Sequence, residues 1–172
     1  YWDWSAMLSA NAGNVFPYTP ATNLLYGLRE ALAMLNEEGL ANVFARHQRH
    51  GQAARIAVEH WGLEVLASDV REYSGSLTAV LMPEGQDADG LRKLILERFD
   101  LSLGNGLGKL QGRVFRIGHL GWFNDLMLAG TLSGIEMGLK AFGLPVPSSG
   151  VAAALDDLGS TSASPALKTT AA

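Results

Sequence analysis

The sequence has no cysteine among its 172 residues. A chain without cysteine forms no disulfide and offers no thiolate to a metal ion. This absence fits a reducing compartment, and we expect a cytoplasmic protein. The spacing of the four histidines matches no zinc-binding pattern, so we expect no metal site. They are His47, His50, His60 and His119.

Concentrated positive charge and long apolar runs are also missing. Lys and Arg number 13 against 17 Asp and Glu, the net charge is −4, and the basic residues are scattered. A nucleic-acid-binding surface needs clustered basic residues, so we expect no nucleic-acid partner. Polar residues interrupt the longest apolar-rich stretch, 123–144, and we expect no membrane-spanning helix. The chain starts at Tyr1 without a signal peptide, which favours a fragment of a longer protein.

What is present is a set of amphipathic segments. Hydrophobic residues make up 48% of the chain, which is enough for a packed core. Apolar residues at one-face helical spacing predict helices over about 20–38, 40–60, 87–99 and 124–142. The first two would form a helical hairpin. The second carries a basic set that we interpret as a solvated face: Arg46, Arg49, His50 and Arg55.

Short β-type runs alternate with the later helices. They predict strands over 63–67, 77–82, 101–103 and 113–118. The expected architecture is a helical hairpin followed by a small α+β layer, with strands on one side and helices on the other. The remaining segments are expected to be irregular at 1–18 and a low-complexity tail at 146–172.

Arg116 is the first candidate for a ligand contact. In the run Val114–Gly118, strand alternation puts Phe115 and Ile117 on one face and Arg116 on the other. A solvent-exposed strand face is the commoner account of such an arginine. The functional interpretation is a rigidly held guanidinium that binds a carboxylate through two parallel hydrogen bonds. Gly118, on the same face, would leave room for the ligand.

Two further segments are candidates for close approach to a ligand. Residues 104–108 form a glycine-rich loop in which glycine permits positive φ and close backbone contact. The loop is no nucleotide-phosphate loop, because Leu110 rather than a hydroxyl residue follows Lys109. Thr19, followed by Pro20, is expected to cap the first long helix. The free N–H groups of that first turn, with a hydroxyl beside them, also suit a phosphate.

Three stretches of the sequence, taken in order, carry a family resemblance. They are Phe16–Glu30, Leu103–Gly108 and Val114–Gly121, the last reading Val-Phe-Arg-Ile-Gly-His-Leu-Gly. Over about residues 1–145 the chain resembles the class V pyridoxal-phosphate-dependent aminotransferases, most closely those of the serine–glyoxylate type. The glycine-rich stretch falls in the expected order between the other two, but by itself it is not specific to the family.

The resemblance implies an α/β protein of the PLP-transferase fold type I, of which this chain would be a carboxy-terminal portion. The portion would hold a helical hairpin and the small C-terminal α+β domain with a mostly antiparallel sheet. Residues 1–60 would be the end of the large domain and its connecting helices. Residues 61–145 would be the small domain, and 146–172 the low-complexity tail.

The resemblance also implies an activity and a cofactor. An aminotransferase that binds pyridoxal 5'-phosphate (PLP) would move an amino group from serine, or alanine, to glyoxylate, giving hydroxypyruvate, or pyruvate, and glycine. The family works as a homodimer with active sites at the subunit boundary. Arg116 matches the arginine that binds the substrate's α-carboxylate. Thr19 matches the threonine that reaches the cofactor phosphate of the neighbouring subunit, whereas Phe16 replaces a tyrosine of alanine–glyoxylate relatives and lacks its hydroxyl.

No catalytic residue of the family falls in this segment. None of the lysines matches the cofactor-binding lysine, which lies upstream in the family: they are Lys93, Lys109, Lys140 and Lys168. We therefore expect this chain by itself to be inactive. One alternative is a stand-alone α+β module that binds a small carboxylate or acts as a regulatory partner. Another is a related transaminase with a different amino donor.

Overall fold

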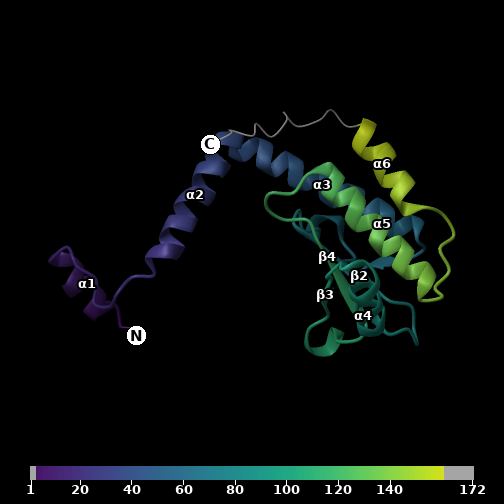
Figure 1. Cartoon of the computed structure of the whole chain (residues 1–172), viewed down its shortest axis with the longest axis horizontal. Helices are drawn as coiled ribbons and strands as arrows, with labels where there is room; N and C mark the ends of the chain where they lie inside the picture. The colour runs from purple at the N-terminus through teal and green to yellow at the C-terminus, as the bar shows by residue number, and fades with distance from the viewer. Residues whose placement is uncertain (1–2, 161–172) are drawn as a thin grey trace. The chain divides into compact units, whose positions relative to one another are not determined.

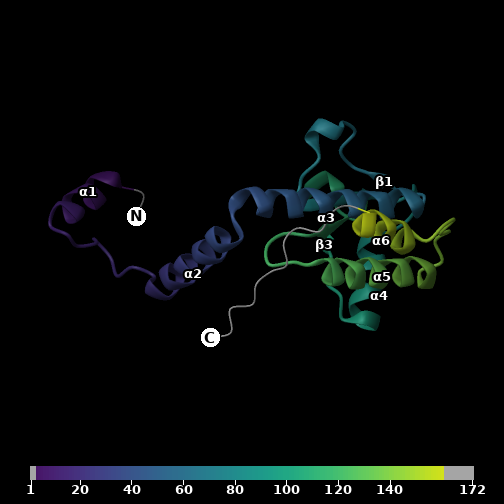
Figure 2. The same cartoon turned by 90° about the horizontal axis from the view of Figure 1, so that it is seen from above.

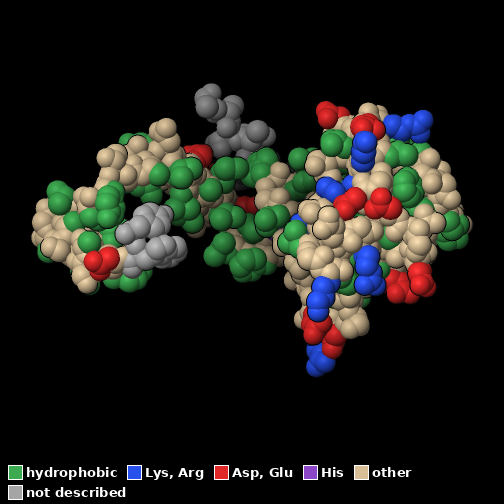
Figure 3. Space-filling model, turned by 90° about the horizontal axis from the view of Figure 1, so that it is seen from below, with side chains coloured by type: hydrophobic (Ala, Val, Ile, Leu, Met, Phe, Trp, Pro, Cys, Tyr) green, Lys and Arg blue, Asp and Glu red, His purple; other side chains and the backbone are tan. Residues whose placement is uncertain are grey.

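The structure, a computed structural model, describes residues 3–160 and separates into two units, with the boundary between Leu40 and Ala41. The first unit contains α1 (Trp4–Ala12) and α2 (Thr22–Glu38), drawn in purple to blue in Figure 1. No residue of either helix is buried. Their apolar side chains therefore face solvent, and Figure 3 shows many of them gathered on this part of the chain.

Helix α1 contradicts the prediction that residues 1–18 are irregular. The Asp3 side chain accepts a hydrogen bond from the Ser5 amide at 2.8 Å and so satisfies an N–H group of the first turn. The segment is rich in Ala and Ser and has no strong apolar periodicity, which explains why apolar spacing does not reveal it. Helix α2 confirms its prediction, and Gly39 ends it with a φ of 83°.

The second unit contains the sheet. Its described elements are α3 (Leu40–His60), β1 (Glu64–Val65), β2 (Leu77–Leu81), α4 (Ala88–Phe99), β3 (Gly104–Asn105), β4 (Val114–Gly118), α5 (Asp125–Ala141) and α6 (Gly150–Ser160). Short 3-10 helices lie in two connections, at Val70–Glu72 and Gly108–Leu110. The strands form one antiparallel sheet in the order β1-β2-β4-β3. Figure 1 labels β2, β3 and β4 of this sheet. The predicted α+β layer with an antiparallel sheet is confirmed.

Helices cover one face of this sheet, and Figure 2 shows α3, α5 and α6 side by side. Phe115 and Ile117 of β4 and Val80 of β2 point into the hydrophobic core. The helices complete this core with Ala57, Val58, Leu91, Ile95, Leu128, Leu132 and Ile135. The other face of β2 and β4 carries half-buried side chains, among them Ala79 and Arg116. The predicted alternation along β4 is therefore confirmed.

The prediction of a strand over 101–103 is wrong. A Cβ on Gly134 of α5 would stand 2.7 Å from Leu101, so the Leu101 side chain packs directly on the helix backbone. The Leu103 side chain is buried, and its carbonyl accepts a hydrogen bond from Arg92 Nε at 2.8 Å. These apolar residues fill the core instead of pairing, and the strand pairing starts at Gly104.

The segment predicted as a low-complexity tail begins with a packed helix. Ala154 and Leu158 of α6 are buried in the core. A Cβ on Gly150 would stand 2.4 Å from the Ala57 carbonyl, so glycine lets α6 start against α3. The tail prediction is therefore wrong for α6, and its remainder, 161–172, lies outside the described residues.

Helices α2 and α3 lie on either side of the boundary between the units, so the helical hairpin stays a prediction. The same holds for the assignment of 1–60 and 61–145 to two domains of a whole enzyme, although α3 groups with the sheet here. Within residues 3–160, no helix combines the length and the apolar character needed to cross a bilayer.

Candidate functional site

Arg116 occupies the middle of β4, between two neighbouring strands. Its cross-strand partners are Ala79 on β2 and Gly104 on β3. Both are small, so the long side chain of Arg116 is the largest group at this level of the sheet. A residue paired on both sides has a backbone fixed by ladder hydrogen bonds, which restricts where the guanidinium can point.

Gly104 presses directly against the Arg116 side chain. A Cβ at position 104 would stand 3.0 Å from Arg116 Nε and 3.1 Å from Arg116 Cβ. A larger residue there would push the arginine away, so the side chain is confined by the neighbouring backbone. This contact identifies what the first glycine of the 104–108 loop approaches: the candidate arginine itself.

Arg116 Nε is buried and has no hydrogen-bond partner among the described residues. A buried unsatisfied N–H group costs about 1–3 kcal/mol, so such a group calls for a ligand or another partner. Gly118, two residues along the same face, has open space where a Cβ would stand. The geometry therefore fits a guanidinium that is held on one side by Gly104 and is free to receive an anion.

The other glycines of the loop have a structural explanation. A Cβ on Gly106 would stand 2.0 Å from the Leu110 carbonyl oxygen, which leaves no room for any side chain. Gly108 has a φ of 54°, in the left-handed region that favours glycine. The turn itself requires both residues, and neither implies a bound phosphate.

Thr19 lies in the first unit, so its site is described separately from Arg116. The side chain is exposed, and the expected capping role is wrong because α2 begins later. Ala21 occupies the N-cap position, where no side chain accepts an N–H of the first turn. The Thr22 amide donates instead to the Pro20 carbonyl at 2.8 Å. The start of α2 thus combines an exposed hydroxyl with a first turn that lacks a side-chain cap.

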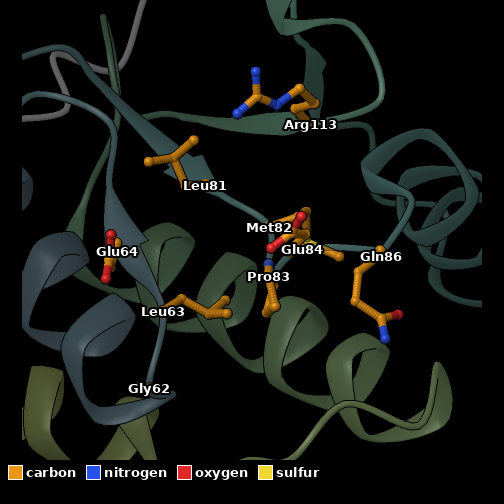
Figure 4. Close-up of a pocket in the computed structure, with 10 residues that line it drawn as sticks. Gly62, Leu63, Glu64, Leu81, Met82, Pro83, Glu84, Gln86 and Arg113 are labelled. Carbon is orange, nitrogen blue, oxygen red and sulfur yellow. The ribbon is translucent and has the colours of Figure 1, made fainter.

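A cavity of about 770 Å³ opens at the start of β4 (Figure 4). Glu64, Glu84 and Arg113 are among its lining residues, and Pro83 and Met82 form part of its wall. Neither Arg116 nor Thr19 lines it, so this cavity is separate from the candidate site predicted from the sequence. Among the described residues, no group of three or more His, Cys, Asp or Glu side chains is placed to hold a metal ion.

The sequence interpretation missed a buried polar network beside β4. The basic set on α3 was expected to be a solvated face, but Arg46 is 4% exposed and His50 is fully buried. The expectation is wrong because both residues fall at helical spacing from Val43, Ala53 and Ala57, which are buried on the same side of α3. That spacing is the signal in the sequence that would have placed them inside.

Asp125, the first residue of α5, is the centre of this network. Arg49 Nη1 and Nη2 donate to the two carboxylate oxygens at 3.0 and 2.6 Å. His50 Nε2 lies 2.8 Å from Asp125 Oδ1. Desolvation opposes ionisation of Asp125, but hydrogen bonds from Arg49 and His50 outweigh it and lower the pKa of the carboxyl group. The pKa of His50 is also lowered, chiefly because its ring is buried.

The chain is similar to several aminotransferases of known kind. The serine–glyoxylate aminotransferase of Methylorubrum extorquens is 50% identical over 155 residues, which are 90% of this chain and 39% of that protein. The enzyme of the same kind from Arabidopsis thaliana is 49% identical over 156 residues, with the same coverage. The L-aspartate–glyoxylate aminotransferase of Paracoccus denitrificans is 42% identical over 164 residues, 95% of this chain and 41% of that protein. This chain is a homologue of the serine–glyoxylate aminotransferases.

Solved structures agree with this relationship. The pyridoxamine–pyruvate aminotransferase from Mesorhizobium loti superposes with a TM-score of 0.79 at 32% identity, covering 84% of this chain and 37% of that one. The ureidoglycine–glyoxylate aminotransferase from Bacillus subtilis gives 0.76 at 30% identity, covering 82% and 37%. The fold is therefore that of part of a class V aminotransferase, as predicted. The chain spans about two fifths of the length of these relatives, and no family profile matches it.

Proposed function

We propose that this chain is the part of a PLP-dependent aminotransferase that binds the carboxylate of both substrates through Arg116. The observation that carries the proposal is the buried, unpartnered Nε of an arginine fixed between Ala79 and Gly104. The amino donor and the oxo acid acceptor of a transaminase each carry a carboxylate. One guanidinium fork would therefore orient both substrates in turn by two parallel hydrogen bonds.

The substrates are proposed from the kind of relatives that the chain has. Three relatives at 45–50% identity are serine–glyoxylate aminotransferases. We propose serine as donor and glyoxylate as acceptor, with hydroxypyruvate and glycine as products. Alanine and L-aspartate are the competing donors, the latter because a relative at 42% identity is named for it.

The residues present fit part of a PLP site. The exposed hydroxyl of Thr19 and the start of α2, which has no side-chain cap, provide donors suited to a phosphate group. When bound, PLP supplies the electron sink for amino transfer, whereas the protein orients the groups that react. In this scheme Thr19 holds the phosphate and Arg116 holds the substrate carboxylate.

The described lysines are not suited to bind the cofactor. Lys140 Nζ donates to Glu136 at 2.7 Å, and Lys93 lies 3.9 Å from Glu97 on an exposed helix surface. Lys109 lies in the exposed turn before β4, and Lys168 lies outside the described residues. We therefore propose that the cofactor-binding lysine comes from sequence that precedes this segment in a longer polypeptide, and that the chain by itself is inactive.

A homodimer in the cytoplasm completes the proposal. The apolar stripe of α2 supports a partner surface, because its leucines are exposed although they repeat at one-face spacing. A second subunit, or the remainder of the polypeptide, would cover it. The stand-alone carboxylate-binding module is disfavoured, since the match to aminotransferases extends over 90% of the chain.

The test is a transamination assay. This sequence, expressed together with the sequence that precedes it in its gene, should convert serine and glyoxylate to hydroxypyruvate and glycine when loaded with PLP. The 172-residue chain alone should give no product. Turnover by the chain alone, or no turnover by the longer polypeptide with serine, alanine or aspartate, would contradict the proposal.

A further inference from the structure

The loop that follows the Arg116 strand is held in place by side chains. Strand β4 ends at Gly118 and α5 begins at Asp125, and the intervening residues form no regular structure. At the start of this loop the His119 amide donates to the Ser76 carbonyl at 3.0 Å. The buried His119 ring then bridges two groups, with Nδ1 3.0 Å from the Gly75 carbonyl and Nε2 3.0 Å from the Thr78 hydroxyl.

Helix α3 binds the middle of the same loop. Arg46 Nη1 donates to the carbonyl oxygens of Gly121 and Phe123 at 2.9 and 3.0 Å. The Gly121 amide donates to His47 Nε2 at 3.1 Å, and His47 Nδ1 lies 2.7 Å from the Val43 carbonyl of its own helix. The loop end is tied by Arg49 and His50 to Asp125, as described above. Backbone groups of this loop, which would otherwise hydrogen-bond to water, are thus bound by side chains of one helix.

Buried polar side chains are concentrated at this loop. Among residues 3–160, five polar or charged residues are buried: Arg46, His50, Thr78, His119 and Glu136. All but Glu136 contact the loop, its Asp125 end or the ring of His119. Buried charged pairs add little net stability, because desolvation offsets their attraction, but they fix geometry narrowly. The buried charges lie at the loop that directly follows the strand of Arg116.

We propose that Arg46, Arg49 and His50 are positioning residues for Arg116, acting through the loop 119–124. The inference rests on the function proposed above for Arg116. By holding the loop, α3 would fix the end of β4 at Gly118, where a Cβ would meet open space that could receive the substrate carboxylate. Loosening the loop would let the end of β4 and Gly118 shift relative to the fixed guanidinium, and small displacements within a binding site are costly.

Arg49→Ala tests this inference in the longer, PLP-loaded polypeptide. The expected result is a KM raised about tenfold for donor and acceptor alike, with a smaller change in kcat, below the hundredfold effect of a 1 Å misplacement. Arg49→Lys should restore part of the affinity, because it keeps a positive charge beside the Asp125 carboxylate but loses the two-point contact. The Gly121 amide should exchange its hydrogen faster in Arg49→Ala than in the unmodified protein.

Lys140→Ala is the matched control. Lys140 also pairs with a carboxylate of α5, Glu136, but at the far end of that helix from the loop. This variant should leave both KM values within about twofold, because it removes an ion pair of α5 without touching the loop. An equal rise in KM for Lys140→Ala and Arg49→Ala would show a general effect of stability and overturn the inference.

Arg116→Lys separates this inference from the proposed function. If Arg116→Lys raises both KM values and neither Arg49 variant does, the positioning role is wrong and the carboxylate role of Arg116 stands. If Arg116→Lys leaves both KM values unchanged, the proposed function fails and the positioning role fails with it. Should Arg49→Ala not fold, Arg49→Lys decides alone: a KM rise of about threefold supports the inference, and none overturns it.

Discussion

The two units of the chain differ in how far their apolar side chains are buried. In the first unit, Leu24 is 75% exposed, Leu28 is 54% exposed, and no residue of α1 or α2 is buried. In the second unit, Phe115 and Leu132 are fully buried in a core shared by the sheet and its helices. The second unit therefore contains the contacts that stabilise its fold, whereas α2 has an apolar face whose partner is not among the described residues.

The two candidate residues lie in surroundings that differ in the same way. Arg116 lies within a sheet whose packing already fixes its backbone. Thr19 lies on an exposed segment before α2. We expect the carboxylate contact to be preorganised and the phosphate contact to depend on assembly with a partner surface.

The largest expected effect is the loss of a core side chain. Phe115→Ala should lower the free energy of unfolding of the chain by about 3–5 kcal/mol, because it leaves a cavity beneath the sheet. Leu28→Ala on α2 should change this free energy by less than about 0.5 kcal/mol, since more than half of that side chain is exposed. Urea denaturation followed by circular dichroism measures both. Equal losses would show that α2 is packed as firmly as β4.

Acid should destabilise the second unit through Glu136. Burial opposes ionisation of this carboxylate, but hydrogen bonds from Lys140, Trp61, the Val151 amide and Ser149 outweigh it and lower its pKa to about 2. Because the folded pKa lies below the ordinary value of 4.5, the stabilisation is full above pH 4.5 and is lost as the pH falls towards 2. The loss is on the order of 3 kcal/mol.

The control for this pH dependence is Glu136→Gln, which should remove most of the loss of stability between pH 4.5 and 2.

His119 affects stability at higher pH, because burial lowers its pKa from 6.5 to about 4. Its neutral ring favours the folded state, so stability should also decline as the pH falls from 6.5 to 4. A denaturation midpoint that stays constant from pH 7 to 3 would contradict both assignments.

The smallest expected effect is at Thr19. In the longer polypeptide, Thr19→Val should weaken PLP binding about tenfold, the loss of one hydrogen bond to a charged group. The stability of the chain without cofactor should not change, since the hydroxyl is exposed and caps no helix. Thr131→Val on α5 is the control, because its hydroxyl is bonded to the Met127 carbonyl at 2.8 Å. Equal PLP affinity of all three proteins, measured by absorbance titration, would remove Thr19 from the site.

Much of the second unit could be predicted from the sequence because its signals are local. The helices α3, α4 and α5 follow from apolar spacing, and Asp87 and Asn124 cap the last two as their side chains suggest. The alternation in β4 placed Arg116 opposite the core. The segment 101–103 and α6 were not predicted correctly, because their apolar or small residues are explained by contacts with α5 and α3 that are distant in sequence.

The candidate site could be predicted only in part. Arg116 and Gly118 are neighbours along one strand, so the sequence shows that they share a face. The contact of Gly104 with Arg116 and the network around Asp125 depend on pairings across 12 residues and more, which no local pattern reveals. The burial of Arg46 and His50 was concealed by their charge, since basic side chains are usually exposed.

The most direct test of the central claim is the pair of KM values of Arg116→Lys in the longer, PLP-loaded polypeptide. We expect both the donor and the acceptor to bind more weakly by roughly 1–3 kcal/mol, because a two-point fork becomes a point charge. Arg113→Lys, at an exposed position just before the same strand, should leave both values unchanged. Unaltered KM values for serine and glyoxylate in Arg116→Lys would contradict the account.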